Sequence, residues 1–150
     1  MITLRALHIP TDWRWVKAHV DCVLCEDSKG IVAERDGETV GVVILDSWAP
    51  NSCQVHLGAT TPLVWKHGLH KEVFRYVFEV CGREMILGLT PANNRTALRF
   101  NKHMGFRQTY VIKDGFAPGI DYIVHEMRRD ECRWIENGPE RTDQRTAAAG

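Results

Sequence analysis

Three features of other protein classes are missing from this sequence: a long hydrophobic run, a signal-peptide pattern and an excess of one charge. The longest uncharged apolar run, residues 40–45, has the length of a strand, whereas a membrane helix needs ~20 apolar residues. The opening residues lack the charged-then-apolar layout of a signal peptide. We therefore expect a soluble, cytoplasmic protein without a membrane partner.

Basic and acidic residues number 19 each, so the formal net charge is zero. Proteins that bind nucleic acid by neutralising phosphates carry an excess of Lys and Arg, so we do not expect a nucleic-acid partner. Charged residues make up 25% of the chain and hydrophobic residues 44%, which is typical of a globular protein. The length of 150 residues favours one domain. We place it at residues 1–135, followed by a polar, mobile tail at 136–150.

The sequence also lacks a disulfide framework, because its five cysteines are odd in number and mostly lie in apolar segments. Cys22 and Cys25 form a lone Cys-x-x-Cys pair with only His19 close by in the sequence. A structural zinc site takes four ligands. We expect this pair to lie on the first helix and expect no metal site.

Hydrophobic periodicity indicates how the elements are ordered. Alternating or continuous apolar patterns predict strands at residues 2–7, 31–35, 39–48, 53–59, 85–89, 107–112 and 122–127. Helical spacing predicts helices from residue 11 or 12 to about 29, at 70–81 and at 95–104.

Short signals refine this pattern. Thr11 or Asp12 is expected to cap the first helix and Asn94 the last, and Asp36-Gly37 predicts a tight hairpin turn. Residues 113–119 are expected to form a long hairpin loop, and the strand at 85–89 to be buried on both faces. The order favours an α+β domain: a mixed, mostly antiparallel sheet of six or seven strands, with helices on both faces and one parallel pair.

The junction from strand 53–59 into helix 70–81 is a candidate anion site, because backbone N–H groups and the positive end of a helix dipole meet there. Gly68 permits close backbone approach, and Lys66, His67 and His70 add positive or titratable groups. On these residues alone, Gly68 is explained more simply as an ordinary turn residue.

A second stretch resembles the late motif of the Gcn5-related N-acetyltransferase (GNAT) superfamily, in which Asn, Ala and Gly-Phe recur at fixed spacing. Asn94, Ala97, Gly105 and Phe106 stand in that register. The earlier junction is similar to the acetyl-CoA loop of the same superfamily, since Pro62 and Gly68 stand at their places. Trp65 replaces the usual Arg or Gln of that loop, and His70 replaces its final small residue. Residues 127–134 also resemble the close of small phage and bacterial acetyltransferase-like proteins.

The resemblance implies an acyl-CoA N-acyltransferase-like fold that binds acetyl-CoA where two parallel strands splay apart. Gly58 stands where a bulge could open that gap. Backbone N–H groups near Ala59 and Thr60 would polarise the thioester carbonyl. Other predicted cofactor-binding residues are Asn94 and Asn101, together with the pyrophosphate-binding backbone of Trp65, Lys66, His67, Gly68, Leu69 and His70.

The implied reaction is attack of a primary amine (a protein N-terminus, a lysine or a small amine) on the thioester. His56 is the candidate general base, because a histidine titrates near neutrality and this one lies on the strand beside the expected thioester site. His125 is the second candidate, and a purely structural strand histidine is the other explanation of His56.

One departure from the motif bears on activity: Asn101 stands where the late motif usually carries a Tyr that protonates the thiolate of coenzyme A. An amide does not serve as that acid. Two alternatives therefore stay open, namely a weakly active or inactive CoA-binding or structural protein with the same fold and an acyltransferase acting on a nucleic acid or small metabolite. The acceptor is not identified by the sequence, and a homodimer is one open oligomeric state.

Overall fold

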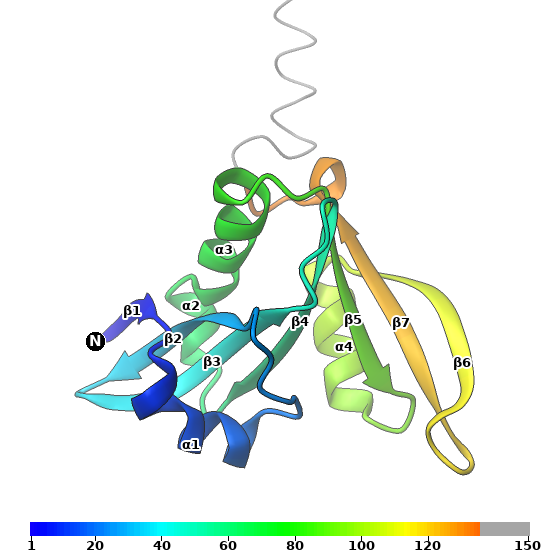
Figure 1. Cartoon of the computed structure of the whole chain (residues 1–150), viewed down its shortest axis with the longest axis horizontal. Helices are drawn as coiled ribbons and strands as arrows, with labels where there is room; N and C mark the ends of the chain where they lie inside the picture. Colours follow the sequence, from blue (N-terminus) through cyan, green and yellow to red (C-terminus); the bar gives the residue numbers. More distant parts are fainter. Residues whose placement is uncertain (136–150) are drawn as a thin grey trace, which may run out of the picture.

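In the computed structural model of the protein, which describes residues 1–135, seven strands form one mixed sheet (Figure 1). Its order is β1-β2-β3-β4-β5-β7-β6. The strands are β1 (Ile2–Ala6), β2 (Lys29–Arg35), β3 (Glu38–Asp46), β4 (Ser52–Ala59), β5 (Met85–Pro91), β6 (Arg107–Ala117) and β7 (Ile120–Arg128). The expected tail, 136–150, lies outside the described residues.

The β4–β5 pair is parallel and all other neighbouring strands are antiparallel, as predicted. β4 and β5 pair only from Ser52 to Gln54 with Met85 to Leu87, and beyond that short ladder they diverge (Figure 1). The sheet is therefore split into a β1–β4 half and a β5–β7–β6 half that are joined at one end.

Helices cover both faces of the sheet. They are α1 (Ile9–His19), α2 (Leu63–Lys66), α3 (Leu69–Phe74), a π-helical turn η1 (Arg75–Val80), α4 (Arg95–Met104) and a 3₁₀ turn η2 (Arg129–Glu131). One buried cluster joins α1 to alternate residues of β2 and β3, including Val32, Val42 and Ile44. The larger cluster joins the opposite residues of the sheet, such as Val43 and Leu45, to α2, α3 and η1.

The first helix is shorter than predicted and starts earlier. Pro10 sits in its first turn, where a missing N–H costs nothing, and neither Thr11 nor Asp12 is the cap, because the helix already begins at Ile9 after His8. The chain turns extended at Val20. Leu24 continues the helical spacing in the sequence but lies beyond the helix and is exposed.

The expectation that Cys22 and Cys25 lie on the first helix is consequently wrong. Both follow the helix in the segment between α1 and β2, and both are free thiols. Burial raises the pKa of the Cys22 thiol to about 11, with Asp46 and Asp21 adding to the effect. Within residues 1–135, no group of three or more His, Cys, Asp or Glu is arranged to hold a metal ion.

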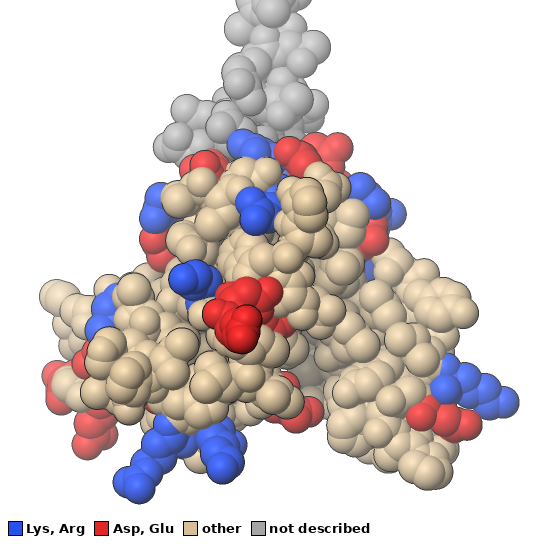
Figure 2. Space-filling model, in the orientation of Figure 1, with Lys and Arg blue, Asp and Glu red and all other residues tan. Residues whose placement is uncertain are grey.

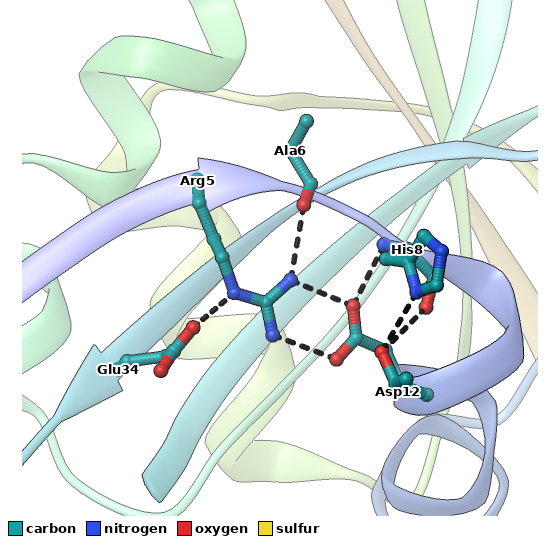
Figure 3. Close-up of polar contacts among 6 residues, drawn as sticks. Arg5, Ala6, His8, Asp12 and Glu34 are labelled. Carbon is teal, nitrogen blue, oxygen red and sulfur yellow. Dashed lines mark hydrogen bonds and ion pairs between the residues drawn. The ribbon is translucent and has the colours of Figure 1, made fainter. Parts of the chain in front are cut away.

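A polar cluster ties the start of α1 to the edge of the sheet (Figure 3). Arg5 on β1 donates from two nitrogens to Asp12, at 2.8 and 2.7 Å, and pairs with Glu34 on β2. The amide of His8 donates to Asp12 at 2.7 Å. Asp12 is 4% exposed, and the hydrogen bonds from Arg5 hold the pKa of its carboxyl below the ordinary value. A buried carboxylate is stable here because its charge is paired and hydrogen-bonded.

The helix predicted at 70–81 forms as α3 followed directly by η1, and Cys81 caps it. Its predicted apolar stripe is confirmed for Val73, Phe74, Val77 and Phe78, all of which are buried. Gly68 precedes α3 with φ of +84°, a conformation that favours glycine. A separate short helix, α2, lies before that glycine and was not predicted.

Two other predictions hold and two fail. The Asp36-Gly37 turn has positive φ at both residues, and α4 spans the predicted residues with the Asn94 side chain accepting from the amide of Ala97 at 3.1 Å. The expected loop at 113–119 is instead continued strand, with a turn at 118–119. β5 is not buried on both faces, since Leu89 is 41% exposed. No helix within residues 1–135 is long and apolar enough to span a membrane.

Candidate active site

A cleft of about 460 Å³ opens where β4 and β5 diverge. It runs from the end of α1, at Asp21, across both strands to α2, α3 and α4. Its walls are mainly apolar, and the polar or titratable side chains among its lining residues are Asp21, His56, His70, Thr90, Asn94, Thr96, Asn101 and His125. The cleft therefore brings together both sequence motifs and the candidate base.

The backbone of β4 offers hydrogen-bond donors to this cleft. Thr60 donates its amide to the carbonyl of Val40 at 2.9 Å, so the alternation of an antiparallel ladder turns the amides of Leu57 and Ala59 away from β3 and toward β5. β5 pairs with neither residue. The Ala59 amide is thus free to donate into the cleft, and so is that of Leu57, whereas the Thr60 amide is already bonded to Val40.

Gly58 does not open the gap by a bulge, because β3 and β4 stay in register from Gly41–Ala59 to Asp46–Gln54. A Cβ at Gly58 would lie 2.4 Å from the carbonyl oxygen of His19. This glycine lets the end of α1 approach the strand. The gap opens instead because β4 and β5 stop pairing after three residues.

His56 lies on β4 and is hydrogen-bonded to Asp46 on β3. Its Nε2 is 3.1 Å from Oδ1 and 3.0 Å from Oδ2 of Asp46. The Asp46 residue is 4% exposed, while the His56 side chain is 25% exposed. His56 is thus a half-buried histidine at the cleft wall with a buried carboxylate behind it.

The α2–α3 junction holds few free amides. Those of Trp65, His67 and Gly68 donate to carbonyls of residues 62–65 at 3.1 Å, so they are bonded within the turn. Leu69 and His70 begin α3, and the first amides of a helix have no partner within it. Lys66 and His67 are exposed at the same junction.

His70 and Trp65 contribute their side chains to aromatic packing. The His70 ring lies edge-on to Trp134, with centroids 4.5 Å apart, and 6.1 Å from Trp65. Both of its ring nitrogens lack a partner among the described residues, and burial lowers the pKa of His70 to about 4. Trp65 also packs on Phe100 of α4 at 4.7 Å. At neutral pH the ring of His70 is therefore uncharged and attracts no phosphate.

The α4 wall contains Asn94 and Asn101. The oxygen of Asn94 is engaged in the helix cap. Asn101 donates from Nδ2 to Thr90 Oγ1 on β5 at 3.0 Å, which fixes the orientation of its amide. His125 on β7 lies opposite Gly88 and is 1% exposed, and burial lowers its pKa. Its two ring nitrogens have no partner within the described chain.

Sequence reasoning missed Asp46 and Thr90. Asp46 ends the apolar strand of residues 40–45, and a charge at the end of a buried strand is a signal that could have been followed. Its pairing with His56 depends on the β3–β4 register. Thr90 is a short polar residue whose partner is eleven positions away, and no local pattern marks it.

The surface of the molecule shows no large region of one charge on the face drawn in Figure 2, where basic and acidic side chains are interspersed. This distribution agrees with the zero net charge. An anionic ligand would therefore be held by local backbone and side-chain donors rather than by a broad basic surface.

Solved structures that share this fold include acetyltransferases. Spermidine/spermine N-acetyltransferase SpeG of Vibrio cholerae, in complex with manganese ions, matches with a TM-score of 0.73 at 14% identity, covering 87% of this chain and 94% of that one. A GNAT-family protein of Desulfovibrio desulfuricans gives 0.70 at 16% identity, covering 85% and 99%. N-acetyltransferase PseH of Campylobacter jejuni, in complex with acetyl coenzyme A, gives 0.62 at 16% identity, covering 86% and 99%.

The chain therefore has the fold of the GNAT acetyltransferases, as the motifs predicted. No protein-family model and no curated protein matches the sequence. At these identities the structural likeness defines the fold, and the chemistry has to be argued from the cleft.

Proposed function

We propose that the protein transfers an acetyl group from acetyl-CoA to a primary amine. The observation that carries the proposal is the divergence of β4 from β5, which leaves unpaired amides of β4 beside His56 in one cleft. In the reaction, the amine nitrogen forms a bond to the thioester carbon and the carbon–sulfur bond breaks. An ammonium acceptor yields the amide, the thiol of coenzyme A and one proton.

The cleft fits the donor substrate in two respects. The amides of Leu57 and Ala59 point into the gap, where they can hydrogen-bond an extended pantetheine arm or the thioester oxygen as its charge develops. Gly88 leaves the opposite wall without a side chain, since a Cβ there would first meet Val55 at 3.6 Å. The pyrophosphate would lie at the start of α3, near the amides of Leu69 and His70 and the exposed Lys66.

His56 acts as the general base in this proposal. Its register partner is Ile44, which packs against α1, so His56 faces the α1 side of the sheet. The cofactor phosphates would lie at α3, on the opposite side. An amine entering from the α1 side therefore meets His56 before it meets the thioester.

Departure of the thiolate relies on a group other than the usual Tyr. Asn101 donates to Thr90 and lacks an acidic proton. Water in the open cleft supplies that proton in our proposal. A slower release of coenzyme A than in Tyr-containing relatives is the expected consequence.

The acceptor class remains the broad one of primary amines. SpeG is described as a spermidine/spermine acetyltransferase, which makes polyamines suitable members of a test panel beside lysine and peptides with free N-termini. Nucleic acid is a less suitable acceptor, because basic and acidic residues balance.

The first experiment measures binding and turnover separately. Excess acetyl-CoA should raise the melting temperature, because a ligand at about 100 times its Kd stabilises the native state by about 2.7 kcal/mol. Mass spectrometry of the amine panel then detects the acetylated product. The His56→Ala variant should lower kcat about 100-fold, a typical contribution of a general base.

His103→Ala is the matched control, because His103 is an exposed histidine of α4 that should leave turnover unchanged. Stabilisation without any acetylated amine would favour the inactive CoA-binding alternative. The absence of stabilisation would reject acetyl-CoA as a ligand.

A further inference from the structure

We propose that Asp46 is a positioning residue that holds the His56 ring with Nε2–H toward the buried carboxylate and Nδ1 free to accept the proton of the amine. The inference rests on the proposed acetyl transfer. It adds to that function the residue that sets the tautomer and orientation of the base.

The geometry of the pair is that of a charge-assisted hydrogen bond. Both oxygens of Asp46 lie within 3.1 Å of Nε2. Asp46 and His56 lie on neighbouring strands, two residues apart in register, because Asp46 pairs with Gln54 and Ile44 with His56. Side chains at such diagonal positions share one face of a sheet, so the ladder itself holds the two groups together.

The chemistry of the two groups then selects the tautomer. A carboxylate only accepts hydrogen bonds, so the ring nitrogen facing it must carry hydrogen. A neutral imidazole has one N–H and one lone pair. With the hydrogen on Nε2, the lone pair lies on Nδ1, and the half-buried ring leaves His56 reachable from the cleft.

Asp46 is itself held in place at the end of β3. Ser47 donates its hydroxyl to Oδ1 of Asp46 at 3.2 Å, and Ser47 has φ of +51°, which is unusual for a residue other than glycine. The Asp46 side chain is 5% exposed, so water does not compete for its oxygens.

The other titratable groups near the pair do not replace His56. Asp21 lines the same cleft and is exposed. The Cys22 thiol, whose pKa is raised to about 11, stays protonated at neutral pH. Of the three histidines that line the cleft, His56 is hydrogen-bonded to a carboxylate. His70 and His125 are buried, and their ring nitrogens have no partner among the described residues.

The decisive variant is Asp46→Asn, compared with Asp12→Asn. Asp12 is an equally buried aspartate, 4% exposed, whose partner Arg5 lies outside the cleft (Figure 3). An Asn at position 46 can donate to Nε2 and so favour the tautomer with hydrogen on Nδ1, the wrong nitrogen for catalysis. We expect kcat to fall about 10- to 100-fold, as part of the contribution of a general base, with the KM for acetyl-CoA unchanged.

The Asp12→Asn variant should keep the wild-type kcat even where it unfolds at a lower temperature. A fall in kcat of similar size in both variants would show that loss of a buried charge, and not positioning, is responsible. An Asp46→Asn enzyme with wild-type kcat would overturn the inference while the proposed function stands.

A spectroscopic measurement on the wild-type protein tests the pair without any variant. The ¹⁵N chemical shifts of the His56 ring at neutral pH should show hydrogen on Nε2. Hydrogen on Nδ1 would overturn the inference even if Asp46→Asn failed to fold. Wild-type protein without turnover on any amine of the panel would overturn the proposed function and the catalytic role of the pair together.

Discussion

His70 is a titratable residue that the fold keeps uncharged. It occupies the position where the acetyl-CoA loop usually has a small residue, yet its ring points into a buried aromatic cluster with Trp134 and Trp65. Burial is the largest cause of its lowered pKa, and Lys71 adds to it. The residue that departs from the motif, His70, thus contributes its side chain to packing.

This burial predicts a pH dependence of stability. The pKa of His70 is about 4 in the native state against 6.5 in the unfolded chain, so the unfolded state binds more protons between these values. The contribution of His70 to native stability is therefore present above about pH 6.5 and is lost as the pH falls toward 4. From pH 7 to pH 5 the His70 share of the loss is about 2 kcal/mol.

The His70→Phe variant should remove that share, because Phe keeps an aromatic ring and cannot bind a proton. Urea unfolding at pH 7 and pH 5 measures the difference. The variant should lose about 2 kcal/mol less than wild type over this interval, although His125 continues to contribute in the same direction. Equal losses in the two proteins would show that His70 is accessible to protons in the native state.

At this scale the sequence indicated residue types but not their partners. His56 is predicted as the base because it lies on a strand beside the motif, and the structure places it among the residues that line the cleft. Its partner Asp46 emerged only when β3 and β4 were in register. The roles of Ala59, Lys66 and Asn101 toward a cofactor are still predictions.

At the scale of elements, the approach of α1 to β4 depends on a single missing side chain. A Cβ at Gly58 would lie 2.4 Å from the His19 carbonyl oxygen and 3.0 Å from a methyl group of Val20. Neither atom belongs to a flexible side-chain end, so the helix terminus or the strand would have to shift. Close packing of this kind makes added volume costly.

We expect Gly58→Ala to destabilise the protein by about 1 to 3 kcal/mol, the usual cost of overpacking. Gly88→Ala is the matched control on the neighbouring strand, since its Cβ would meet only Val55 at 3.6 Å, an ordinary contact. Urea unfolding of the two variants measures the contrast. Similar stabilities would mean that the end of α1 moves freely.

The start of α4 provides a second prediction at this scale, because Asn94 caps the helix. Asn94→Ala should cost about 1 kcal/mol of unfolding free energy, whereas Asn94→Asp should keep the cap. Acetyl-CoA affinity of the Asp variant, measured by titration calorimetry, then reports on any further role. Unchanged affinity would remove Asn94 from the predicted cofactor residues.

Elements with their own local signals were predicted well. The Asp36-Gly37 hairpin and α4 formed as expected, because a turn pair and a cap act within a few residues. The end of α1 and the β6–β7 hairpin were predicted less well. α1 ends at His19 although the helical spacing continues to Leu24, and β6 continues to Ala117 through the expected loop, so local patterns did not fix where these elements end.

At the scale of the whole molecule, two halves of one sheet are joined at the β4–β5 ladder by a short run of parallel pairing. Beyond that ladder the backbone groups of β4 that face β5 are unpaired. In the proposed function, the acyl-CoA lies in the gap beside them. A ligand lying in the gap would bridge the halves and bond to amides that are otherwise open to water.

Hydrogen exchange should report this bridging. Saturating acetyl-CoA should slow exchange at Leu57 and Ala59 and at the first amides of α3, while the outer pair β1–β2 should change little because it lies away from the cleft. Mass spectrometry with and without acetyl-CoA measures the effect. Protection confined to other segments would place the ligand elsewhere.

The sequence by itself determined the order of the strands and the main helices and the α+β class, because hydrophobic periodicity, caps and turn residues act over short distances. The two motifs led to the acetyltransferase fold through their resemblance to the GNAT superfamily. The tertiary structure alone decided where β4 and β5 part, which amides stay free there and which carboxylate stands behind His56. These depend on strand register and on contacts between residues far apart in the chain. The resulting cleft exists because only three residues of each strand are paired.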